Sequence, residues 1–371
     1  PAAYPFIRPP GFTVDASIEH GGAEQYKGGG TEKGGSVAPA RLVVGQSSFS
    51  TGRNCAPFAP NLFTYHRVGD LFTYNRGEDH QNPGFMICQK CGRALDPRDP
   101  KPHTYPANIP PHFGRVRGPR AGDECPNKFN FQNMPILGYK FHSEVILLGV
   151  DLPEDLDALY TTKSGQAVWT SFGTLIANAA ALYMQIDPDE LKVGVRAVKR
   201  TDSRIHGEVY IYDDVPGGAG YARSIDANLE AILQKALELG EHCANPICNG
   251  ACYHCVLDYR NQLYHPILDR RLGAAVLNFI LKGQKPTISK DEADFYAKGL
   301  AEYAKGSGYT VENGKTLAGQ YLPIILKDRI GQEIGLWVNH PLQAMPKPEV
   351  TNRIIGQTGM RIAVHSSFDL E

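Results

Sequence analysis

The spacing of hydrophobic residues changes along the chain, and each spacing predicts a different kind of structure. In the first 140 residues the apolar positions form short runs bounded by turn residues, such as 62–65 and 71–74, which predicts short β-strands. Residues 145–150 form one continuous apolar run, which predicts a buried strand. Apolar residues then recur every three or four positions over 164–186, which predicts one face of a long helix.

The same reasoning covers the rest of the chain. Strands are expected at 191–198 and at 208–212, where apolar and polar residues alternate. A helix with an apolar face is expected on each side of residues 243–255. After a linker at 284–289, one helix and four strands are expected, at 291–305, 309–312, 321–327, 333–338 and 361–365.

Together these elements predict an α+β fold in three regions. Residues 1–140 are expected to form a β-rich region, and residues 141–283 a domain of helices and strands. Residues 284–371 are expected to form a small α/β domain.

The composition describes a folded chain without a global affinity for polyanions. Of its 371 residues 42% are hydrophobic and the formal net charge is -1, so any nucleic-acid surface must be a local patch. The apolar runs fall short of the ~20 residues that a membrane span needs, so no membrane partner is expected. Eight cysteines without a secretory signal predict a reducing, cytoplasmic location and metal binding. Because the chain opens with Pro1 and not with methionine, we expect a fragment of a longer protein.

Half of the cysteines lie within thirteen residues, and this segment carries the strongest chemical signal in the chain. They are Cys243, Cys248, Cys252 and Cys255. Turn-forming residues between them let the short chain close around a tetrahedral ion, so the pattern predicts a zinc site. The alternatives are a disulfide, ordinary buried thiols, or a redox pair of Cys252 and Cys255. A redox pair usually stands alone, and two more cysteines precede this one, which favours zinc.

A second cysteine pair follows an apolar strand in the first region. Cys88 and Cys91 stand in Cys-x-x-Cys-Gly, a zinc-knuckle pattern in which the glycine lets backbone amides turn toward the thiolates. Two more ligands are needed, and the candidates are His103 and Cys125, with Cys55 in reserve. The alternative is an unmetallated knuckle with Cys125 simply buried. Because protein ligands close both proposed sites, two structural zinc ions are expected, not catalytic ones.

A strand, a glycine-rich turn and a helix follow one another around residues 213–221. This geometry can bind phosphate at a helix N-terminus, but the glycines lack the dinucleotide-binding spacing, so a structural turn is favoured. Asp213 and Asp214 could hold a metal ion, although turn capping is favoured.

Two further enzyme motifs are considered and not supported. One helix followed by three strands also opens restriction-type nuclease cores, but the expected third strand, 333–339, lacks the Glu-x-Lys of such enzymes. Residues 308–316 resemble an ATP-binding loop, but five residues rather than four separate the glycines. No catalytic site is therefore expected on these residues.

Several of these features together resemble a known family. They are the run 212–221, the four-cysteine segment ending Cys-Tyr-His-Cys, Tyr-Arg-Asn-Gln at 259–262 and Leu-Asp-Arg at 268–270. The combination resembles the zinc-binding domain at the C-terminus of large superfamily-two DEAD/DEAH-box helicases. This is the four-cysteine domain of the mitomycin-repair-factor helicases, which has relatives in bacterial anti-phage defence systems. The resemblance covers residues 140–282. Residues 85–125 resemble the segment just upstream in larger members, and 285–371 lie outside it.

The resemblance implies an accessory region that works beside an ATP-driven motor on DNA, in defence or repair. It makes the four clustered cysteines the zinc ligands. The family's motor motifs are absent from this sequence, so it places the ATPase upstream in the same polypeptide or in a partner chain, and it makes defence-system subunits possible partners. Single-stranded or duplex DNA is the expected ligand. Candidate contacts are Arg260, Arg270, Arg271, Lys199 and Arg200 for phosphates, and Tyr253 and Tyr259 for bases.

Other interpretations stay open at this stage. Each candidate DNA contact can instead be a surface charge or an aromatic ring at the edge of the core. The chain can be a scaffold without a motor that docks a separate helicase or nuclease. It can also be a hydrolase that uses Asp213 and Asp214, and RNA can replace DNA as the ligand.

Overall fold

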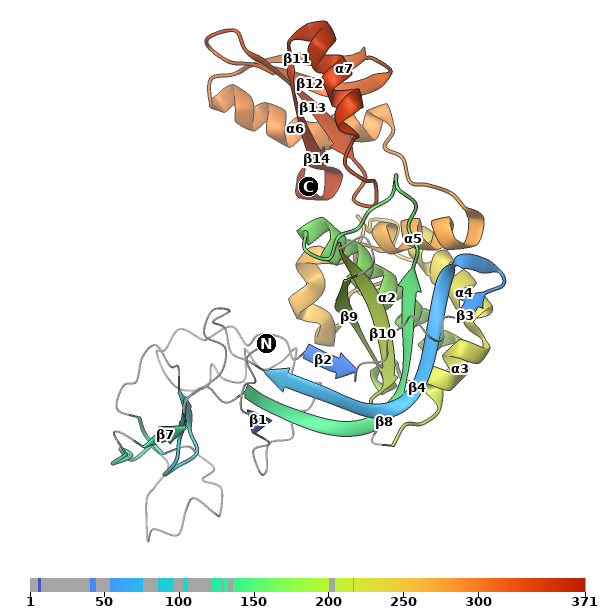
Figure 1. The fold of residues 1–371 in the computed structure, drawn as a ribbon, viewed down its shortest axis with the longest axis vertical. Coiled ribbons are helices and arrows are strands. Elements are labelled where there is room, and N and C mark those ends of the chain that lie inside the picture. The colour runs from blue at the N-terminus through green and yellow to red at the C-terminus, as the bar shows by residue number, and fades with distance from the viewer. Residues whose placement is uncertain are drawn as a thin grey trace.

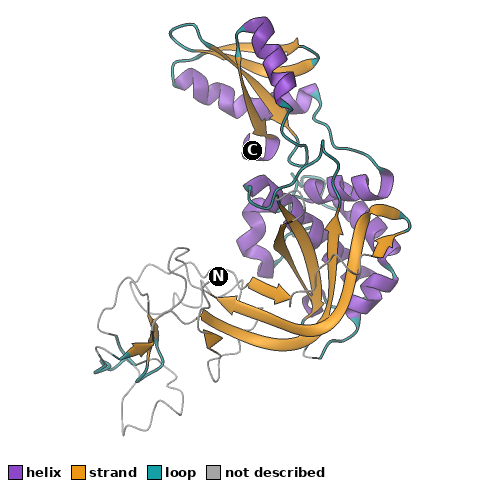
Figure 2. Ribbon diagram, in the orientation of Figure 1, coloured by secondary structure: helices purple, strands orange, loops and turns teal. Residues whose placement is uncertain are grey.

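The computed structural model describes residues 6–7, 41–44, 54–75, 86–95, 103–105, 122–127, 130–132, 136–199, 204–215 and 217–370. Within these ranges the chain builds a seven-stranded, a four-stranded and a three-stranded sheet (Figure 1). Helices cover one face of the largest sheet, and the four-stranded sheet with its own helices forms a separate C-terminal unit (Figure 2). The mixture of helices and strands confirms the predicted α+β class.

The seven-stranded sheet is built around two long antiparallel strands, β4 and β8. Its members are β1 (Phe6–Ile7), β2 (Arg41–Val44), β3 (Asn54–Ala56), β4 (Ala59–Asn75), β8 (Ile136–Val150), β9 (Leu191–Lys199) and β10 (Ile205–Asp213). Their order is β2-β4-β8-β10-β9, with β1 beside β8 and β3 beside β4. β4 pairs with β8 from Leu62 to Asn75. The two short strands predicted at 62–65 and 71–74 were therefore wrong, because β8 offers one continuous partner to both of them and to the polar residues between them.

β8 also runs through residue 140, where the sequence analysis places a domain boundary. β4 from the first region and β10 from the second flank β8, so the two regions share one sheet. The apolar run 145–150 lies in β8 and is buried along its whole length, as the sequence predicted.

Three helices, α2, α4 and α5, pack together over one face of this sheet and enclose the main hydrophobic core (Figure 2). The helices of this part are α2 (Lys163–Met184), η2 (Pro188–Glu190), α3 (Tyr221–Ala227), α4 (Leu229–Glu241), η3 (Tyr259–Ile267) and α5 (Arg270–Lys282). Trp169 of α2 is fully buried, and its indole Nε1 donates to the carbonyl of Ala158 at 2.7 Å. A Cβ at Gly207 of β10 would lie 2.3 Å from the Trp169 ring. The glycine therefore lets the largest core side chain lie directly on the sheet.

The predicted helices are present, but their ends differ from the prediction. α2 ends before Gln185, which adopts a left-handed conformation. Leu182 and Tyr183, which fall within the apolar face predicted over 164–186, are 56% and 45% exposed. The helix expected after the glycine turn is broken at Asn228 into α3 and α4. Its apolar face is nevertheless buried, because α3 packs on the sheet and α4 packs on α2 and α5.

α2 is also long and apolar enough, by composition alone, to cross a membrane. From the sequence, the apolar runs were expected to be too short to span a membrane. In the structure, 72% of the most apolar window of α2 is buried inside the protein, as expected for a core helix.

The smallest sheet consists of three very short strands. They are β5 (Met86–Cys88), β6 (Ala94–Leu95) and β7 (Phe131–Gln132), in the order β6-β5-β7. β5 enters the second cysteine pair, as the sequence predicted.

The C-terminal unit contains the five elements that were predicted for it. Its elements are α6 (Lys290–Gly306), β11 (Thr310–Leu317), β12 (Gln320–Lys327), β13 (Glu333–Asn339), α7 (Pro348–Thr358), β14 (Arg361–Ser366) and α8 (Ser367–Leu370). β11, β12 and β13 are antiparallel, whereas β14 is parallel to β13. A parallel neighbour needs a crossover connection, and α7, which the sequence analysis missed, provides it. The helix and three strands of a restriction-type core are thus present, but β13 carries Glu333 and no lysine.

Candidate metal centres

The four clustered cysteines converge in the loop between α4 and η3, which we call the zinc loop (243–255). The Sγ of Cys252 lies 3.5 Å from that of Cys243 and 3.7 Å from that of Cys255. The Sγ atoms of Cys248 and Cys255 are 3.8 Å apart, and all four lie within 4.8 Å of one another. A tetrahedral ion with Zn–S bonds of about 2.3 Å places its sulfurs roughly 3.8 Å apart. The spacing fits four thiolates around zinc.

Backbone amides of the loop point at the sulfurs and stabilise their ionised form. His254 donates its N–H to the Cys252 sulfur at 3.4 Å, and Cys252 donates its own to the Cys255 sulfur at 3.2 Å. Burial acts to raise the pKa of Cys252, but the His254 amide and the neighbouring thiols bring it down to about 7. Burial raises the pKa of Cys255. Zinc must therefore displace protons from some of these thiols when it binds.

The zinc loop is fastened to both flanking helices. The carbonyl of Gly250 accepts the backbone N–H of Arg270 at 2.9 Å. The guanidinium of Arg270 in turn donates to the carbonyls of Gly240 at 2.5 Å and Glu241 at 3.1 Å, at the end of α4. Gly250 has a φ of +92°, and a Cβ there would lie 2.8 Å from a carboxylate oxygen of Asp269. The loop therefore joins the end of α4 to the start of α5, as the sequence predicted.

The second predicted set of ligands also converges. Cys88, Cys91, His103 and Cys125 are all buried, and their ligand atoms lie within 4.8 Å of one another. Cys88 and Cys91 come from the knuckle after β5, where Gly92 has a φ of +76°. A short antiparallel bridge places the other two side by side: Cys125 donates its backbone N–H to the carbonyl of His103 at 2.8 Å. The reserve candidate Cys55 lies in β3, and its side chain is outside the described part of the structure.

The polar atoms around the second set suit a metal ion. The Nε2 of His103 is buried and has no hydrogen-bond partner among the residues that the structure describes. Burial, followed by the charge of Arg93, lowers the pKa of His103, which keeps its lone pair free to bind a cation. Asn127 donates its side-chain N–H to the Cys88 sulfur at 3.0 Å. An imidazole nitrogen without a partner in a pocket of thiols is costly unless a metal ligates it.

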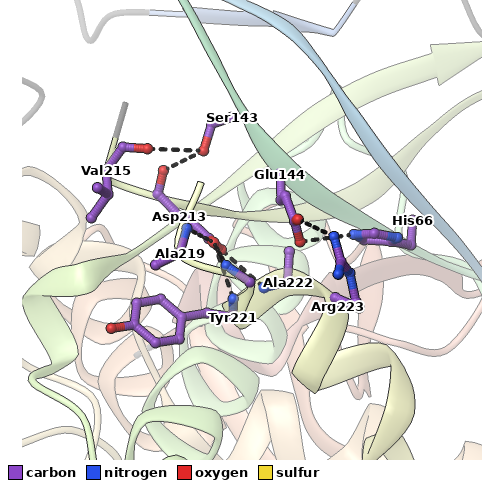
Figure 3. Close-up of polar contacts among 10 residues, drawn as sticks. His66, Ser143, Glu144, Asp213, Val215, Ala219, Tyr221, Ala222 and Arg223 are labelled. Atoms are coloured by element: carbon purple, nitrogen blue, oxygen red, sulfur yellow. Dashed lines mark hydrogen bonds and ion pairs between the residues drawn. The ribbon is translucent and has the colours of Figure 1, made fainter. Parts of the chain in front are cut away.

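The glycine-rich turn uses its amide groups internally, which supports the structural interpretation (Figure 3). One carboxylate oxygen of the fully buried Asp213 accepts the N–H groups of Ala219, Gly220 and Tyr221 at 2.7, 2.8 and 3.0 Å. The other accepts that of Ala222 at 2.9 Å. The carboxylate thus occupies the position that a phosphate takes at such a turn. Asp213 is a cap of α3, as favoured from the sequence.

Beside this turn lies a polar cluster that the sequence analysis did not identify (Figure 3). The Glu144 carboxylate accepts from Arg223 at 2.6 Å and contacts His66 Nε2 at 3.3 Å. A Cβ at Gly218, whose φ is +80°, would lie 2.9 Å from the Glu144 side chain. The three residues come from β4, β8 and α3, so no spacing in the sequence links them. They hold the glycine turn and α3 against the sheet.

The structure describes the side chains of four of the seven candidate DNA contacts. Arg270 is bound to α4, and Arg271 donates to both carboxylate oxygens of Asp269. Tyr253 and Tyr259 are 66% and 62% exposed, beside the metal site. For the remaining three, Arg260, Lys199 and Arg200, the side chains lie outside what the structure describes.

Comparison with known proteins finds similarity in the part of the chain around the zinc loop. The family model of the MrfA Zn-binding domain matches residues 172–256. The Druantia protein DruE of Escherichia coli (strain UMEA 4076-1) is 29% identical over 242 residues, which are 62% of this chain and 13% of that protein. The chain therefore spans only a small part of the curated relative that it matches.

Two crystal structures of DUF1998 helicase MrfA also match. The structure bound to DNA is 13% identical and has a TM-score of 0.38, over 66% of this chain and 25% of that one. The structure bound to DNA and AMPPNP is 11% identical and has a TM-score of 0.29, over 59% and 22%. Residues 172–256, which include the four converging thiols, thus match the MrfA Zn-binding domain, the family that the sequence resembles.

Proposed function

We propose that this chain is the C-terminal accessory region of an ATP-dependent DNA helicase or translocase of bacterial anti-phage defence or DNA repair, acting in the cytoplasm. The observation that carries the proposal is the match of residues 172–256 to the MrfA Zn-binding domain, with the four thiols of that domain brought together. The DruE relative is much longer than this chain, which leaves room for a motor elsewhere. Zinc is structural in this proposal, because four protein ligands leave no open position for a reacting water.

The exposed tyrosines beside the zinc loop are the proposed contacts to DNA. Tyr253 packs edge-on against His265, with ring centroids 5.8 Å apart. This contact restricts the orientation of the Tyr253 ring. Tyr259 begins η3, six residues further along the chain. Stacking of a base on such a ring contributes about 1–3 kcal/mol and does not depend on sequence. In this proposal the metal holds both rings in place, because it closes the loop that contains Tyr253 and precedes Tyr259.

A scaffold without its own motor is the second candidate. Ile247, at the tip of the zinc loop, is 87% exposed. An apolar side chain this exposed, in the same loop as the exposed Tyr253, also suits a protein partner. In that case the partner is a separate helicase or nuclease, and the cysteines are needed for assembly and not for the ATPase itself.

DNA-stimulated ATP hydrolysis by the natural, untruncated gene product tests the proposal. We expect robust activity from one polypeptide, and we expect Tyr253→Ala with Tyr259→Ala to raise the DNA concentration needed for half-maximal stimulation at least tenfold. Asn249→Ala, an exposed change in the same loop, is the matched control and should leave the stimulation unchanged. Activity that appears only with a co-purifying partner would favour the scaffold, and no activity in either case would remove the helicase assignment.

A second zinc ion, bound by the knuckle, is part of the proposal. We expect two zinc ions per chain by elemental analysis. We expect one in His103→Ala, because that substitution removes the Nε2 proposed to ligate the second ion. Asn130→Ala, an exposed change beside β7, should retain both. One ion in the wild-type chain, with the four cysteines of the zinc loop protected from alkylation, would show that the knuckle is unmetallated.

A further inference from the structure

The turn that leads from the last zinc ligand into η3 is closed by one side chain, that of Asn261. Its Nδ2 donates to the carbonyl of Val256 at 2.8 Å, and its Oδ1 accepts the backbone N–H of Asp258 at 2.8 Å. The backbone of Asn261 leaves the helical range, with a φ of −97° and a ψ of 20°, so η3 is interrupted at this residue. Val256 directly follows the ligand Cys255, so Asn261 ties η3 to the end of the zinc loop.

The same amide group fixes the imidazole ring of His265. The Nε2 of His265 lies 2.9 Å from the carbonyl oxygen of Asp258 and 2.9 Å from Asn261 Oδ1. A carbonyl oxygen only accepts, and the other end of the Asn261 amide must be its NH₂ group because it faces the carbonyl of Val256. Nε2 therefore carries a proton and donates it, and two acceptors hold the imidazole in one orientation.

The ring of Tyr253 rests against this imidazole. The two ring centroids are 5.8 Å apart and the ring planes meet at 82°. Tyr253 is 66% exposed, and an exposed side chain exchanges between rotamers unless a neighbour restricts it. The contacts from Val256 through Asn261 and His265 to Tyr253 thus form one continuous path from the end of the zinc loop to an exposed aromatic ring.

We infer that Asn261 and His265 are positioning residues that hold Tyr253 for stacking on an unpaired base, which makes single-stranded DNA the ligand of this surface. The inference rests on the proposed function, in which Tyr253 contacts DNA. The two residues act by ordering the ring before DNA arrives, so less conformational freedom is lost when a base stacks on it. A base inside a duplex is already stacked on both faces and is not available to the ring without unstacking.

Binding of a labelled oligothymidine by the zinc-loaded full chain tests the inference. We expect Tyr253→Ala to raise the dissociation constant about fivefold or more, and His265→Ala and Asn261→Ala about threefold or more each. Tyr253→Ala combined with His265→Ala should equal Tyr253→Ala alone, because His265 acts only through the ring. Binding of a closed circular duplex should not change. Gln262→Ala, a partly exposed change in the same helix, is the matched control.

The outcomes distinguish this inference from the proposed function. Unchanged binding in Tyr253→Ala would remove the proposed DNA contact, and the inference with it. Weaker binding in Tyr253→Ala but not in His265→Ala or Asn261→Ala, or effects of Tyr253→Ala and His265→Ala that add in full, would overturn the inference alone. An equal loss of affinity for the duplex would overturn the assignment to single strands.

Fluorine NMR of the zinc-loaded chain labelled with 3-fluorotyrosine tests the positioning without DNA. The signal that is missing in Tyr253→Phe belongs to Tyr253. We expect this signal to shift and to sharpen in Asn261→Ala, because the ring then loses its fixed neighbour, while the zinc content and the circular dichroism stay unchanged. An unchanged signal would contradict the positioning role. If Asn261→Ala loses zinc, His265→Phe replaces it, because it keeps an aromatic ring without the Nε2 donor, and the same two outcomes decide.

Discussion

Replacing Cys252 with serine is expected to remove the zinc ion of the zinc loop and to lower the free energy of unfolding by about 4 kcal/mol or more. Its sulfur lies 3.5 Å from that of Cys243 and 3.7 Å from that of Cys255, so it belongs to the centre of the ligand set. Without the ion, the remaining three thiols have no metal to coordinate. The loop then loses the cross-link that closes it between α4 and α5. Urea denaturation and elemental analysis of the same sample measure both effects.

The expected loss of stability arises from removing a zinc ligand, and not from any substitution in the loop. Asn249→Ala changes an exposed residue between the second and third ligands, and it should shift the free energy of unfolding by less than about 0.5 kcal/mol. A Cys252→Ser protein that keeps its full zinc content and its denaturation midpoint would show that the four thiols do not form the metal site. Chelation of the wild-type chain should reproduce the effect of the substitution and be reversed by added zinc.

Asp213→Asn is expected to lower the free energy of unfolding by about 2–4 kcal/mol. The carboxylate accepts four backbone N–H groups from the turn and the first residues of α3, and it is fully buried. An amide of the same shape offers one acceptor oxygen, and its NH₂ group would face some of those donors. Buried donors would be left without a partner, and the start of α3 would lose its cap.

The neighbouring residue provides the matched control for this substitution. Asp214 is partly exposed and forms an ion pair with Lys192 at 3.5 Å, so Asp214→Asn should cost less than about 1 kcal/mol. A stable, normally folded Asp213→Asn protein would contradict the capping role. If that same protein had lost a metal-dependent hydrolytic activity present in the wild type, the hydrolase interpretation would replace it.

Local patterns in the sequence were sufficient to predict chemistry that depends on closely spaced residues. The four cysteines of the zinc loop and the knuckle pair Cys88 and Cys91 are each close in the chain, so short turns bring them together in almost any fold. The glycine turn was likewise interpreted correctly as a structural cap, because Asp213 and the amides it binds are separated by only six to nine residues.

Contacts between distant residues could not be predicted in the same way. The cluster of His66, Glu144 and Arg223 draws on three elements, and its members are 78 and 79 residues apart. β4 was divided into two strands because residues 66–70 are mostly turn-like or polar, whereas pairing with β8 supplies partners for all of them. Propensity describes what a segment prefers alone, and a long neighbouring strand outweighs it.

The sequence by itself determined the α+β class, the zinc loop and the apolar faces of the helices, because each follows from residues within one or two turns of one another. Only the tertiary structure decided that the first and second regions share a sheet, that Arg270 fastens the zinc loop to α4, and that Arg271 binds Asp269. It also decided that Leu342 lies in the core of the domain before it. These outcomes depend on which surfaces meet when distant segments pack, and the burial and hydrogen bonds gained there are not encoded in any local spacing.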